Sequence, residues 1–240
     1  MTTGAKTIIV TGANRGVGRA TAERLVREGH RVLITARDFT KGERAASEIR
    51  AAVAVAQVEA RRLDLASFQS VRDFAGGILC EGLAVDVLLH NAGVLTPSKT
   101  RRMTIDGIED VLGVNVLGPF LLTRELLPAL ERSAGARVVC VSSRLHLPGG
   151  PDAPARFDFG DPQQTRDYRA GRAYRNSKLA LVWFTYELQR RLPPRRITAN
   201  AMPWLRADDR RRRCDRLFAA DAALCASAHA VHDLGRHRLA

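Results

Sequence analysis

Short apolar runs alternate with longer segments of helical periodicity along most of the chain. The apolar runs lie near residues 7–10, 31–35, 55–63, 85–89, 137–141 and 196–201. The segments with helical periodicity lie near residues 17–28, 41–51, 67–76, 104–131 and 171–192. Strands that alternate with helices predict a parallel sheet with helices on both faces. We therefore expect an α/β fold in a single domain, since 240 residues suffice for one substantial core.

A glycine-rich turn follows the first apolar run and precedes the first helical segment. It reads Thr-Gly-Ala-Asn-Arg-Gly-Val-Gly over residues 11–18. Glycines let the backbone approach a pyrophosphate closely, and the free amides at the helix start then face the anion. This order predicts dinucleotide binding in a doubly wound sheet of the Rossmann type, although glycines also occur in turns without a ligand. The candidate cofactor-binding residues of the turn are Gly12, Asn14, Arg15, Gly16, Val17 and Gly18.

The residues after the second apolar run bear on which dinucleotide is bound. A site selective for NAD places a carboxylate near this point for the ribose 2′-hydroxyl. This chain has Ala36 and then Arg37 there, with Arg15 in the phosphate turn. Because two guanidinium groups suit a 2′-phosphate, we expect NADP(H) rather than NAD(H). In the alternative interpretation, Arg37 is a solvated loop residue and Asp38 turns inward.

The last helical segment carries a pair of residues that suits proton transfer. Tyr174 and Lys178 are four residues apart, so their side chains leave the same face of a helix. Tyrosine has an unperturbed pKa near ~10, and an ammonium about 4 Å away would favour the phenolate by roughly 4 kcal/mol. That effect would bring the pKa of the phenol towards neutral pH, where general acid–base catalysis is efficient. The same spacing occurs by chance on many helices, so the other motifs decide its meaning.

Together the motifs resemble those of the short-chain dehydrogenase/reductase family, from about residue 6 to about residue 203. In chain order they are the glycine-rich turn at 11–18, Asp64-Leu65, His90-Asn91-Ala92-Gly93, Asn115, Ser142-Ser143, Tyr174 and Lys178. Within the family, the chain is similar to the retinol dehydrogenase-like branch. This similarity lies in residues 41–46, 118–123 and 177–180, and in the long insert from Phe157 to Tyr168.

The resemblance implies roles for four candidate catalytic residues. Tyr174 would be the general acid/base for the substrate oxygen, and Lys178 would lower the pKa of Tyr174 and hold the nicotinamide ribose. Ser143 would hydrogen-bond the substrate oxygen, and Asn115 would anchor a water that links Lys178 to solvent. In the structural alternatives, Ser142-Ser143 is a turn at a strand end and Asn115 is an amide that caps a helix kink.

The resemblance also extends the cofactor site beyond the glycine-rich turn. The added cofactor-binding residues are Asp64, Leu65, Asn91, Ala92 and Gly93, with Tyr174 and Lys178 at the nicotinamide end. The family usually has asparagine where this chain has His90. We expect His90 to be a packing substitution without a catalytic role.

The charge and the cysteines narrow the range of partners and compartments. The net charge of +13 raises the possibility of nucleic-acid binding, but nearly all of it comes from arginines scattered along the chain. We expect no nucleic-acid partner; steeply salt-dependent DNA binding would contradict this. The four cysteines lack paired spacing, so we expect no metal site and a reducing, cytoplasmic location. We expect neither a secretory signal before the first strand nor an apolar run long enough to span a membrane.

The composition changes abruptly after the last apolar run. The family pattern continues with a closing segment and a seventh strand at the sheet edge, whereas this chain continues with an arginine- and alanine-rich segment. We therefore expect an NADP-binding domain over 1–203, an atypical tail over 204–240 and no edge strand in that tail. A shifted reading frame or a truncated end is one explanation, and a divergent but genuine tail is the other. Resequencing the coding region would distinguish them.

Two functions follow from the sequence. The first is an NADP-dependent oxidoreductase that transfers a hydride between the cofactor and a carbonyl/alcohol substrate. The resemblance implies a lipophilic aldehyde, ketone or secondary alcohol, whose specificity would lie partly in residues 144–170, and a homodimer is one possible assembly. The second is a nucleotide-binding relative with little or no turnover because the carboxy-terminal segment is altered.

Overall fold

The computed structural model describes residues 4–95, 100–147, 155–192 and 196–204. The strands are β1 (Thr7–Val10), β2 (Arg31–Ala36), β3 (Val58–Arg62), β4 (Val87–His90), β5 (Ala136–Ser143) and β6 (Ile197–Trp204). The helices are α1 (Gly16–Arg27), α2 (Phe39–Ala52), α3 (Phe68–Cys80), α4 (Asp110–Leu112), α5 (Gly118–Glu131) and α6 (Ala170–Arg191). Two short elements complete the order, the π-helix η1 (Gly113–Leu117) and the 3₁₀-helix η2 (Arg144–His146).

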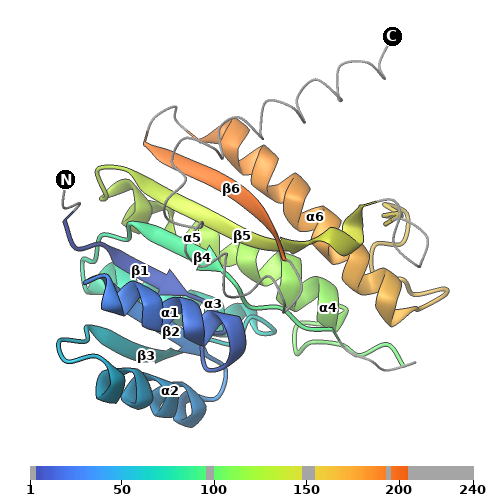
Figure 1. Cartoon of the computed structure of the whole chain (residues 1–240). Coiled ribbons are helices and arrows are strands. Elements are labelled where there is room, and N and C mark those ends of the chain that lie inside the picture. The colour runs from blue at the N-terminus through green and yellow to red at the C-terminus, as the bar shows by residue number, and fades with distance from the viewer. Residues whose placement is uncertain (1–3, 96–99, 148–154, 193–195, 205–240) are drawn as a thin grey trace. The chain divides into compact units, whose positions relative to one another are not determined.

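The six strands form one parallel sheet in the order β3-β2-β1-β4-β5-β6 (Figure 1). The chain moves outward from β1 to β3, returns to the centre and moves outward again from β4 to β6. The strand order therefore reverses between β1 and β4. In doubly wound sheets, ligands bind beyond the carboxyl ends of the strands at this reversal. The predicted fold is confirmed.

Each face of the sheet has its own hydrophobic core. Ile9 of β1 belongs to the core under α3, α5 and α6, whereas Ile8 and Val10 belong to the core under α1 and α2. Successive side chains of a strand point to opposite faces, so a strand covered on both sides needs an unbroken apolar run. This is why β1 reads Thr-Ile-Ile-Val rather than as an alternating pattern.

The helix predicted over 104–131 is interrupted. Residues before Asp110 form a turn in which Gly107 has a φ of 72°, and Met103 bridges to Glu109. The carboxylate of Glu109 accepts hydrogen bonds from the amides of Val111 (3.0 Å) and Leu112 (2.7 Å), which starts α4. The predicted start at 104 was therefore wrong, because a side-chain cap fixes the helix start six residues later.

The same helical run bears on the expected absence of a membrane-spanning segment. By length and composition alone, residues Asp110–Glu131 could cross a membrane, contrary to that expectation. However, 56% of its most apolar window is buried, and α5 contributes Leu122, Leu126 and Leu130 to the core. A core helix passes the same test, so the match gives only weak support for a membrane span.

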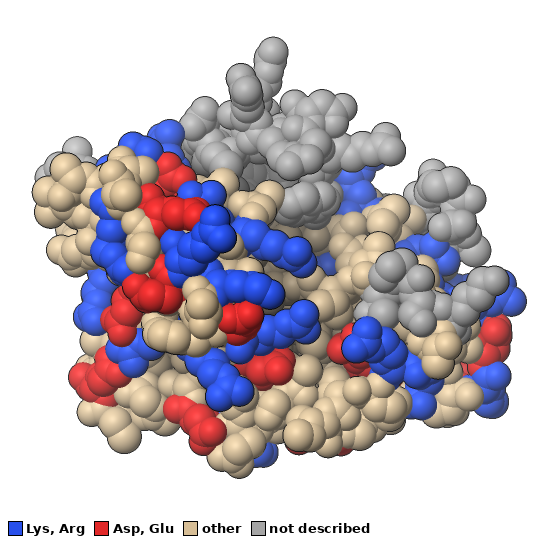
Figure 2. Space-filling model, turned by 90° about the horizontal axis from the view of Figure 1, so that it is seen from below, with Lys and Arg blue, Asp and Glu red and all other residues tan. Residues whose placement is uncertain are grey.

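Basic and acidic side chains are interspersed on the molecular face shown in Figure 2. Exposed ion pairs occur on α1 between Arg24 and Glu28 (2.6 Å) and on α2 between Arg44 and Glu48 (3.0 Å). Such pairs stabilise the fold little, but they show that arginines and carboxylates alternate along these helices. The expected absence of a nucleic-acid partner stays a prediction.

Strand β6 is the last described element, so it bears on the predictions made for the carboxy terminus. Strand β6 pairs with β5 from Ile197 to Trp204, three residues further than the apolar run predicted. Within the described residues, it is the last strand of the sheet. The predicted atypical tail covers residues 204–240. Trp204, its first residue, belongs to β6, and residues 205–240 lie outside the described residues.

Candidate active site

The glycine-rich turn is held by the segment that follows β4. The buried hydroxyl of Thr11 accepts hydrogen bonds from the amides of Asn91 and Ala92, both at 3.0 Å. The Asn91 side chain in turn donates to the carbonyls of Thr11 (2.8 Å) and Gly12 (3.3 Å). The two segments, about 80 residues apart in sequence, therefore meet at the reversal point of the sheet.

Two glycines of the turn are required by this close approach. Gly12 has a φ of 65°, and a Cβ there would lie 2.9 Å from Ala92. A Cβ on Gly18 would lie 2.8 Å from the Gly12 carbonyl oxygen and would overlap the Asn91 amide. Gly16 differs, because its φ of 60° favours glycine but open space surrounds it. Gly12 and Gly18 are needed for the close packing of the turn, whereas the space beside Gly16 is open.

The start of α1 suits an anion such as a pyrophosphate. Arg15 is its N-cap in an extended conformation, and no side chain caps the helix. The first amides of α1 are therefore available to a ligand, and the helix dipole favours negative charge there. The residues present fit the dinucleotide that the glycine-rich turn predicts, with Asn14 and Val17 in the same turn.

Asp38 is occupied at the start of α2. Its carboxylate accepts a hydrogen bond from the Lys41 amide (3.1 Å) and lies 3.3 Å from the Lys41 ammonium. The hydrogen bond from the Lys41 backbone amide is the main reason why the pKa of Asp38 is lowered. Arg37 and Arg15 are both exposed, after β2 and β1, which are neighbouring strands. The positive groups are therefore free to face solvent while the nearby carboxylate caps a helix.

Asp64 and Leu65 follow β3, and the side chains of both make contacts within the protein. The Asp64 carboxylate accepts a hydrogen bond from the Ala66 amide (3.0 Å), and Leu65 is a buried core residue. A Cβ on Gly118 would lie 2.6 Å from the Leu65 carbonyl oxygen, so the start of α5 passes directly beside this turn.

Lys178 lies almost fully buried behind the nicotinamide end of the predicted cofactor site. Its ammonium donates to the Val141 carbonyl at 2.8 Å, and burial lowers its pKa to about 8. A Cβ on Gly93 would lie 3.3 Å from the Lys178 Nζ and 3.4 Å from the Asn115 Oδ1. The segment after β4, the π-helix and α6 thus converge around Lys178.

The pKa of Tyr174 corrects one expectation. The Lys178 Nζ lies 5.6 Å from the centre of the Tyr174 ring. It donates a hydrogen bond to the Val141 carbonyl and not to the phenol oxygen. Burial raises the pKa of Tyr174, and among the described residues the opposing influence is a hydrogen bond with the Ser143 side chain. The expected lowering of the Tyr174 pKa by Lys178 is therefore absent, because the ammonium is engaged by Val141 and the phenol is partly desolvated.

The two serines at the end of β5 have different hydrogen-bond partners. Ser142 donates to the Lys178 carbonyl at 2.8 Å, which ties β5 to α6. Ser143 contacts the Tyr174 phenol and accepts a weak hydrogen bond from the Leu145 amide at 3.3 Å. The second serine is therefore the one beside the predicted acid, as the family resemblance implied.

Asn115 lies at the centre of the π-helix and is buried. Its Oδ1 accepts from the Val94 amide (2.8 Å), and its Nδ2 donates to the Val94 carbonyl and to the Ser177 hydroxyl, both at 3.0 Å. The structural alternative for Asn115, an amide at a distorted helix, describes these contacts well. Nothing in the sequence identified Ser177 as the partner of Asn115.

His90 is buried and packs against α5. Its Nε2 lies 2.7 Å from the Thr123 hydroxyl, which donates its own proton to the Pro119 carbonyl at 2.8 Å. The Nε2 is therefore the donor, and its Nδ1 is buried without a partner among the described residues. Burial lowers the pKa of His90 to about 3, so the ring is neutral at physiological pH.

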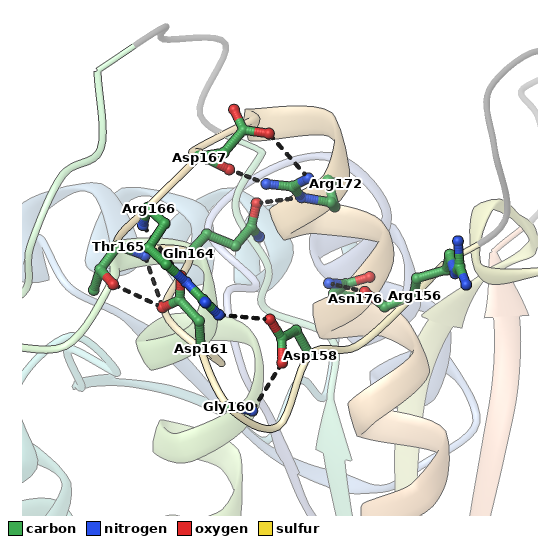
Figure 3. A network of polar contacts seen from close by, with 10 residues as sticks. All are labelled: Arg156, Asp158, Gly160, Asp161, Gln164, Thr165, Arg166, Asp167, Arg172 and Asn176. Carbon is green, nitrogen blue, oxygen red and sulfur yellow. Dashed lines mark hydrogen bonds and ion pairs between the residues drawn. The ribbon is translucent and has the colours of Figure 1, made fainter.

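The insert before α6 is held by a polar network (Figure 3). The Asp161 carboxylate accepts from the amides of Thr165 (2.8 Å) and Arg166 (3.1 Å), and these bonds lower its pKa to about 2. The Gln164 side chain accepts from the Arg172 Nε at 2.8 Å, and the Asn176 amide donates to the Arg156 carbonyl at 2.9 Å. The described part of the insert is therefore held by internal hydrogen bonds and by hydrogen bonds to α6.

A second attachment joins the insert to the start of α4. The buried Glu109 carboxylate accepts from the Tyr168 hydroxyl at 3.2 Å, and the Gln163 side chain accepts from the Glu109 amide at 2.9 Å. The sequence did not identify these residues, because a glutamate or a glutamine in a polar stretch has no distinctive spacing. The insert thus connects the helices that carry Asn115 and Tyr174.

The sequence matches the profile of a family described as short chain dehydrogenase over residues 6–155. Among curated proteins, it is 47% identical over 199 residues to human retinol dehydrogenase 13 and 46% identical over 197 residues to human retinol dehydrogenase 12. Each match covers 82% of this chain but only 57% and 60% of the respective relative. The chain therefore spans less than two thirds of the length of these relatives.

Solved structures with the same fold include two NADP complexes. The RhlG/NADP active-site complex of Pseudomonas aeruginosa is 26% identical, with a TM-score of 0.68, and covers 88% of this chain and 77% of that one. A metagenomic short-chain oxidoreductase in complex with NADP is 27% identical, with a TM-score of 0.65, and covers 86% of both chains.

Proposed function

The chain belongs to the short-chain dehydrogenase family, in its retinol dehydrogenase-like branch, and on this premise we propose that it is an NADP-preferring oxidoreductase. Its substrate would be a carbonyl/alcohol pair on a lipophilic molecule, as in the relatives named retinol dehydrogenase. The observation that carries the proposal is the meeting of Ser143, Tyr174 and Lys178 at the carboxyl end of β5.

When bound, the nicotinamide cofactor supplies the hydride for reduction of a carbonyl carbon or accepts it on oxidation of the alcohol. The turn from Gly12 to Gly18 and the start of α1 would hold its phosphates, and Asp64 to Leu65 and Asn91 to Gly93 would line its adenosine side. Arg15 and Arg37 would bind a 2′-phosphate through charge-assisted hydrogen bonds.

The chemistry at the substrate oxygen belongs to the residues of β5 and α6. In the reducing direction, Tyr174 donates its phenolic proton to the carbonyl oxygen while Ser143 hydrogen-bonds the same oxygen. The alcohol product is then released, and Tyr174 regains a proton from solvent through the region of Lys178 and Asn115. In the oxidising direction, Tyr174 takes the alcohol proton.

A thermal-shift titration with NADPH and NADH tests the cofactor half of the proposal. A ligand at ~100 times its dissociation constant stabilises the folded state by roughly 2.7 kcal/mol, so a working site gives a clear rise in Tm. We expect a larger rise with NADPH. Turnover is then measured with retinal and simpler lipophilic aldehydes.

The two outcomes separate the proposal from its alternative. NADPH oxidation that depends on the aldehyde supports the enzyme. Clear NADPH binding without turnover on any lipophilic carbonyl would instead support a nucleotide-binding relative with little activity.

A further inference from the structure

We propose that Ser177 is a positioning residue that couples the π-helix η1 to the tyrosine of α6. This inference rests on the proposed function. Ser177 is buried, with 1% of its surface exposed, and lies between Tyr174 and Lys178 on the first turns of α6. It has no contact with solvent through which a substrate could reach it, so its effect on the reaction must pass through its neighbours.

The hydrogen bonds of Asn115 fix its amide in one orientation. The Val94 amide needs an acceptor and the Val94 carbonyl needs a donor, so Oδ1 faces the first (2.8 Å) and Nδ2 the second (3.0 Å). The remaining hydrogen of Nδ2 is directed at the Ser177 Oγ, also at 3.0 Å. Both side-chain donors of Asn115 are therefore used by the protein itself.

The direction of the next bond follows from the first. Because the Ser177 Oγ accepts from Asn115, its own proton can be donated to another group. It donates this proton to the Tyr174 carbonyl, whose oxygen lies 2.8 Å from the Ser177 Oγ. A continuous chain of hydrogen bonds thus runs from Val94 through Asn115 and Ser177 to the backbone of Tyr174. Buried chains of this kind polarise one another and hold their members in one arrangement.

The π-helix explains how Asn115 reaches α6. Short π-helical segments inside α-helices occur frequently at functional sites. Here the widened turn lies between α4 and α5, and Asn115 is its central residue. Gly118, at the start of α5, has no room for a side chain against the Leu65 carbonyl, so the position of η1 is also set from the cofactor side.

The consequence for the reaction lies in the contact between Tyr174 and Ser143. Within the described residues, that hydrogen bond is the influence that lowers the pKa of Tyr174, and it requires the start of α6 to lie at a fixed distance from the end of β5. Removing the Ser177 hydroxyl leaves a buried donor on Asn115 without an acceptor and removes one hydrogen bond to the Tyr174 carbonyl. We expect η1 and α6 to separate slightly, which weakens the contact with Ser143.

The test compares Ser177→Ala with Thr185→Ala. Thr185 is a matched control because it lies on the same helix, is equally buried, and donates its hydroxyl proton to the Leu181 carbonyl (2.7 Å). No hydrogen bond in the described part of the chain connects it to η1. Both variants lose one buried hydroxyl on α6, but only Ser177→Ala breaks the connection to Asn115.

Two measurements are made on each full-length variant. The first is kcat, KM and the NADPH dissociation constant with a lipophilic aldehyde. The second is the ionisation of Tyr174 in the presence of NADP⁺, followed by NMR of protein labelled with ¹³C at the tyrosine Cζ. The chain has only three tyrosines, so tyrosine-to-phenylalanine variants assign each signal.

We expect Ser177→Ala to lower kcat about tenfold, since small misplacements of a reacting group have large effects on rate. Its NADPH dissociation constant should stay within about twofold, and the pH midpoint of the Tyr174 signal should rise by about one pH unit. Thr185→Ala should change neither. If Ser177→Ala keeps the wild-type kcat and midpoint, or if Thr185→Ala shows the same losses, the positioning role is wrong.

A second variant covers the case in which Ser177→Ala does not fold. Ser177→Cys keeps a weak donor and acceptor at the same position and should give an intermediate Tyr174 midpoint. An unchanged midpoint in this variant would also contradict the proposal. The NMR midpoint does not depend on turnover, so an inactive wild-type protein that binds NADP⁺ would refute the proposed function while the role of Ser177 is still decided.

Discussion

The two halves of the sheet build their parts of the site from different materials. From β1 to β3, the candidate site consists mainly of backbone, namely two crowded glycines and the free amides of α1, together with the exposed side chains of Arg15 and Arg37. The buried polar residues described in this half are Thr11, Thr21 and Thr35. From β4 to β6, the buried polar and charged residues are His90, Glu109, Asn115, Thr123, Ser142, Ser143, Gln164, Asn176, Ser177, Lys178 and Thr185.

The difference shows what each half can tolerate. A backbone surface depends on space, so it fails when a side chain is added where none fits. A buried polar cluster depends on every donor finding an acceptor, so it fails when a single atom is removed or charged. Substitutions can therefore damage one half while the other half continues to work.

Tyr174→Phe should produce the largest separation of the two halves. It removes the proton donor and keeps the ring, so we expect kcat to fall by about 10²- to 10⁴-fold, the usual contribution of general acid–base catalysis. The NADPH dissociation constant should stay nearly unchanged, because the proposed phosphate and adenosine contacts are made by the glycine-rich turn and by the segments after β3 and β4, not by the Tyr174 hydroxyl. Steady-state kinetics and a fluorescence titration measure the two effects. A variant that keeps a tenth or more of the wild-type rate would exclude Tyr174 as the acid.

Gly18→Ala should damage the backbone half in the opposite way. The added Cβ meets the Gly12 carbonyl and the Asn91 amide, neither of which can move freely. We expect a loss of about 3 kcal/mol in the free energy of unfolding, at the upper end for overpacking, and loss of the Tm rise with NADPH. Urea unfolding and thermal shift measure both effects.

Gly76→Ala is the matched control for Gly18→Ala. Gly76 lies inside α3, and a Cβ there would have nothing within 4 Å. Alanine should therefore stabilise the protein by roughly 0.5–1 kcal/mol, because glycine is unfavourable inside a helix. If both variants destabilise the protein equally, crowding at Gly18 is not the cause.

His90 tests whether the polar half is sensitive to acid. Burial holds the pKa of His90 at about 3, whereas an unfolded histidine titrates near ~6.5. The unfolded state therefore binds more protons as the pH falls, and stability is lost below about pH 6.5. The linkage relation gives a loss of about 2 kcal/mol between pH 8 and pH 5.

His90→Asn should remove that part of the pH dependence. Asparagine is the residue that the family usually has here, and its side chain has no group that titrates between pH 5 and pH 8. Urea midpoints at pH 8 and pH 5 should differ less in this variant than in the wild type. His30→Asn, at a partly exposed position just before β2, is the control and should keep the wild-type difference. Equal pH dependence in all three proteins would show that His90 is not the group responsible.

The same contrast explains what the sequence could reveal. The six strands and the order of the helices were predictable, because doubly covered strands read as apolar runs and helices as periodic segments. The glycine-rich turn was also predictable, since it occupies eight consecutive residues. In both cases the signal is local in the sequence.

The polar half was harder to predict because its partners lie far apart in the chain. Asn115 and Ser177 are 62 residues apart, and Glu109 and Tyr168 are 59 apart. Neither pair has a spacing that a helix or a strand would explain. The pKa of Tyr174 was misjudged for a related reason: helical spacing places Lys178 on the same face but does not reveal that Val141 holds its ammonium.

Arg37→Asp should give the smallest and most specific effect, since it changes selectivity within the backbone half. Arg37 is exposed, and Asp38 already caps α2, so the substitution should leave the fold intact. We expect the ratio of NADPH to NADH affinity to fall about tenfold, or about 1.4 kcal/mol, because a charge-assisted contact with the 2′-phosphate is lost. Arg44→Asp on α2 changes the net charge equally and is the control. If both variants shift the ratio alike, the cause is the general field of the protein, and Arg37 does not bind the phosphate directly.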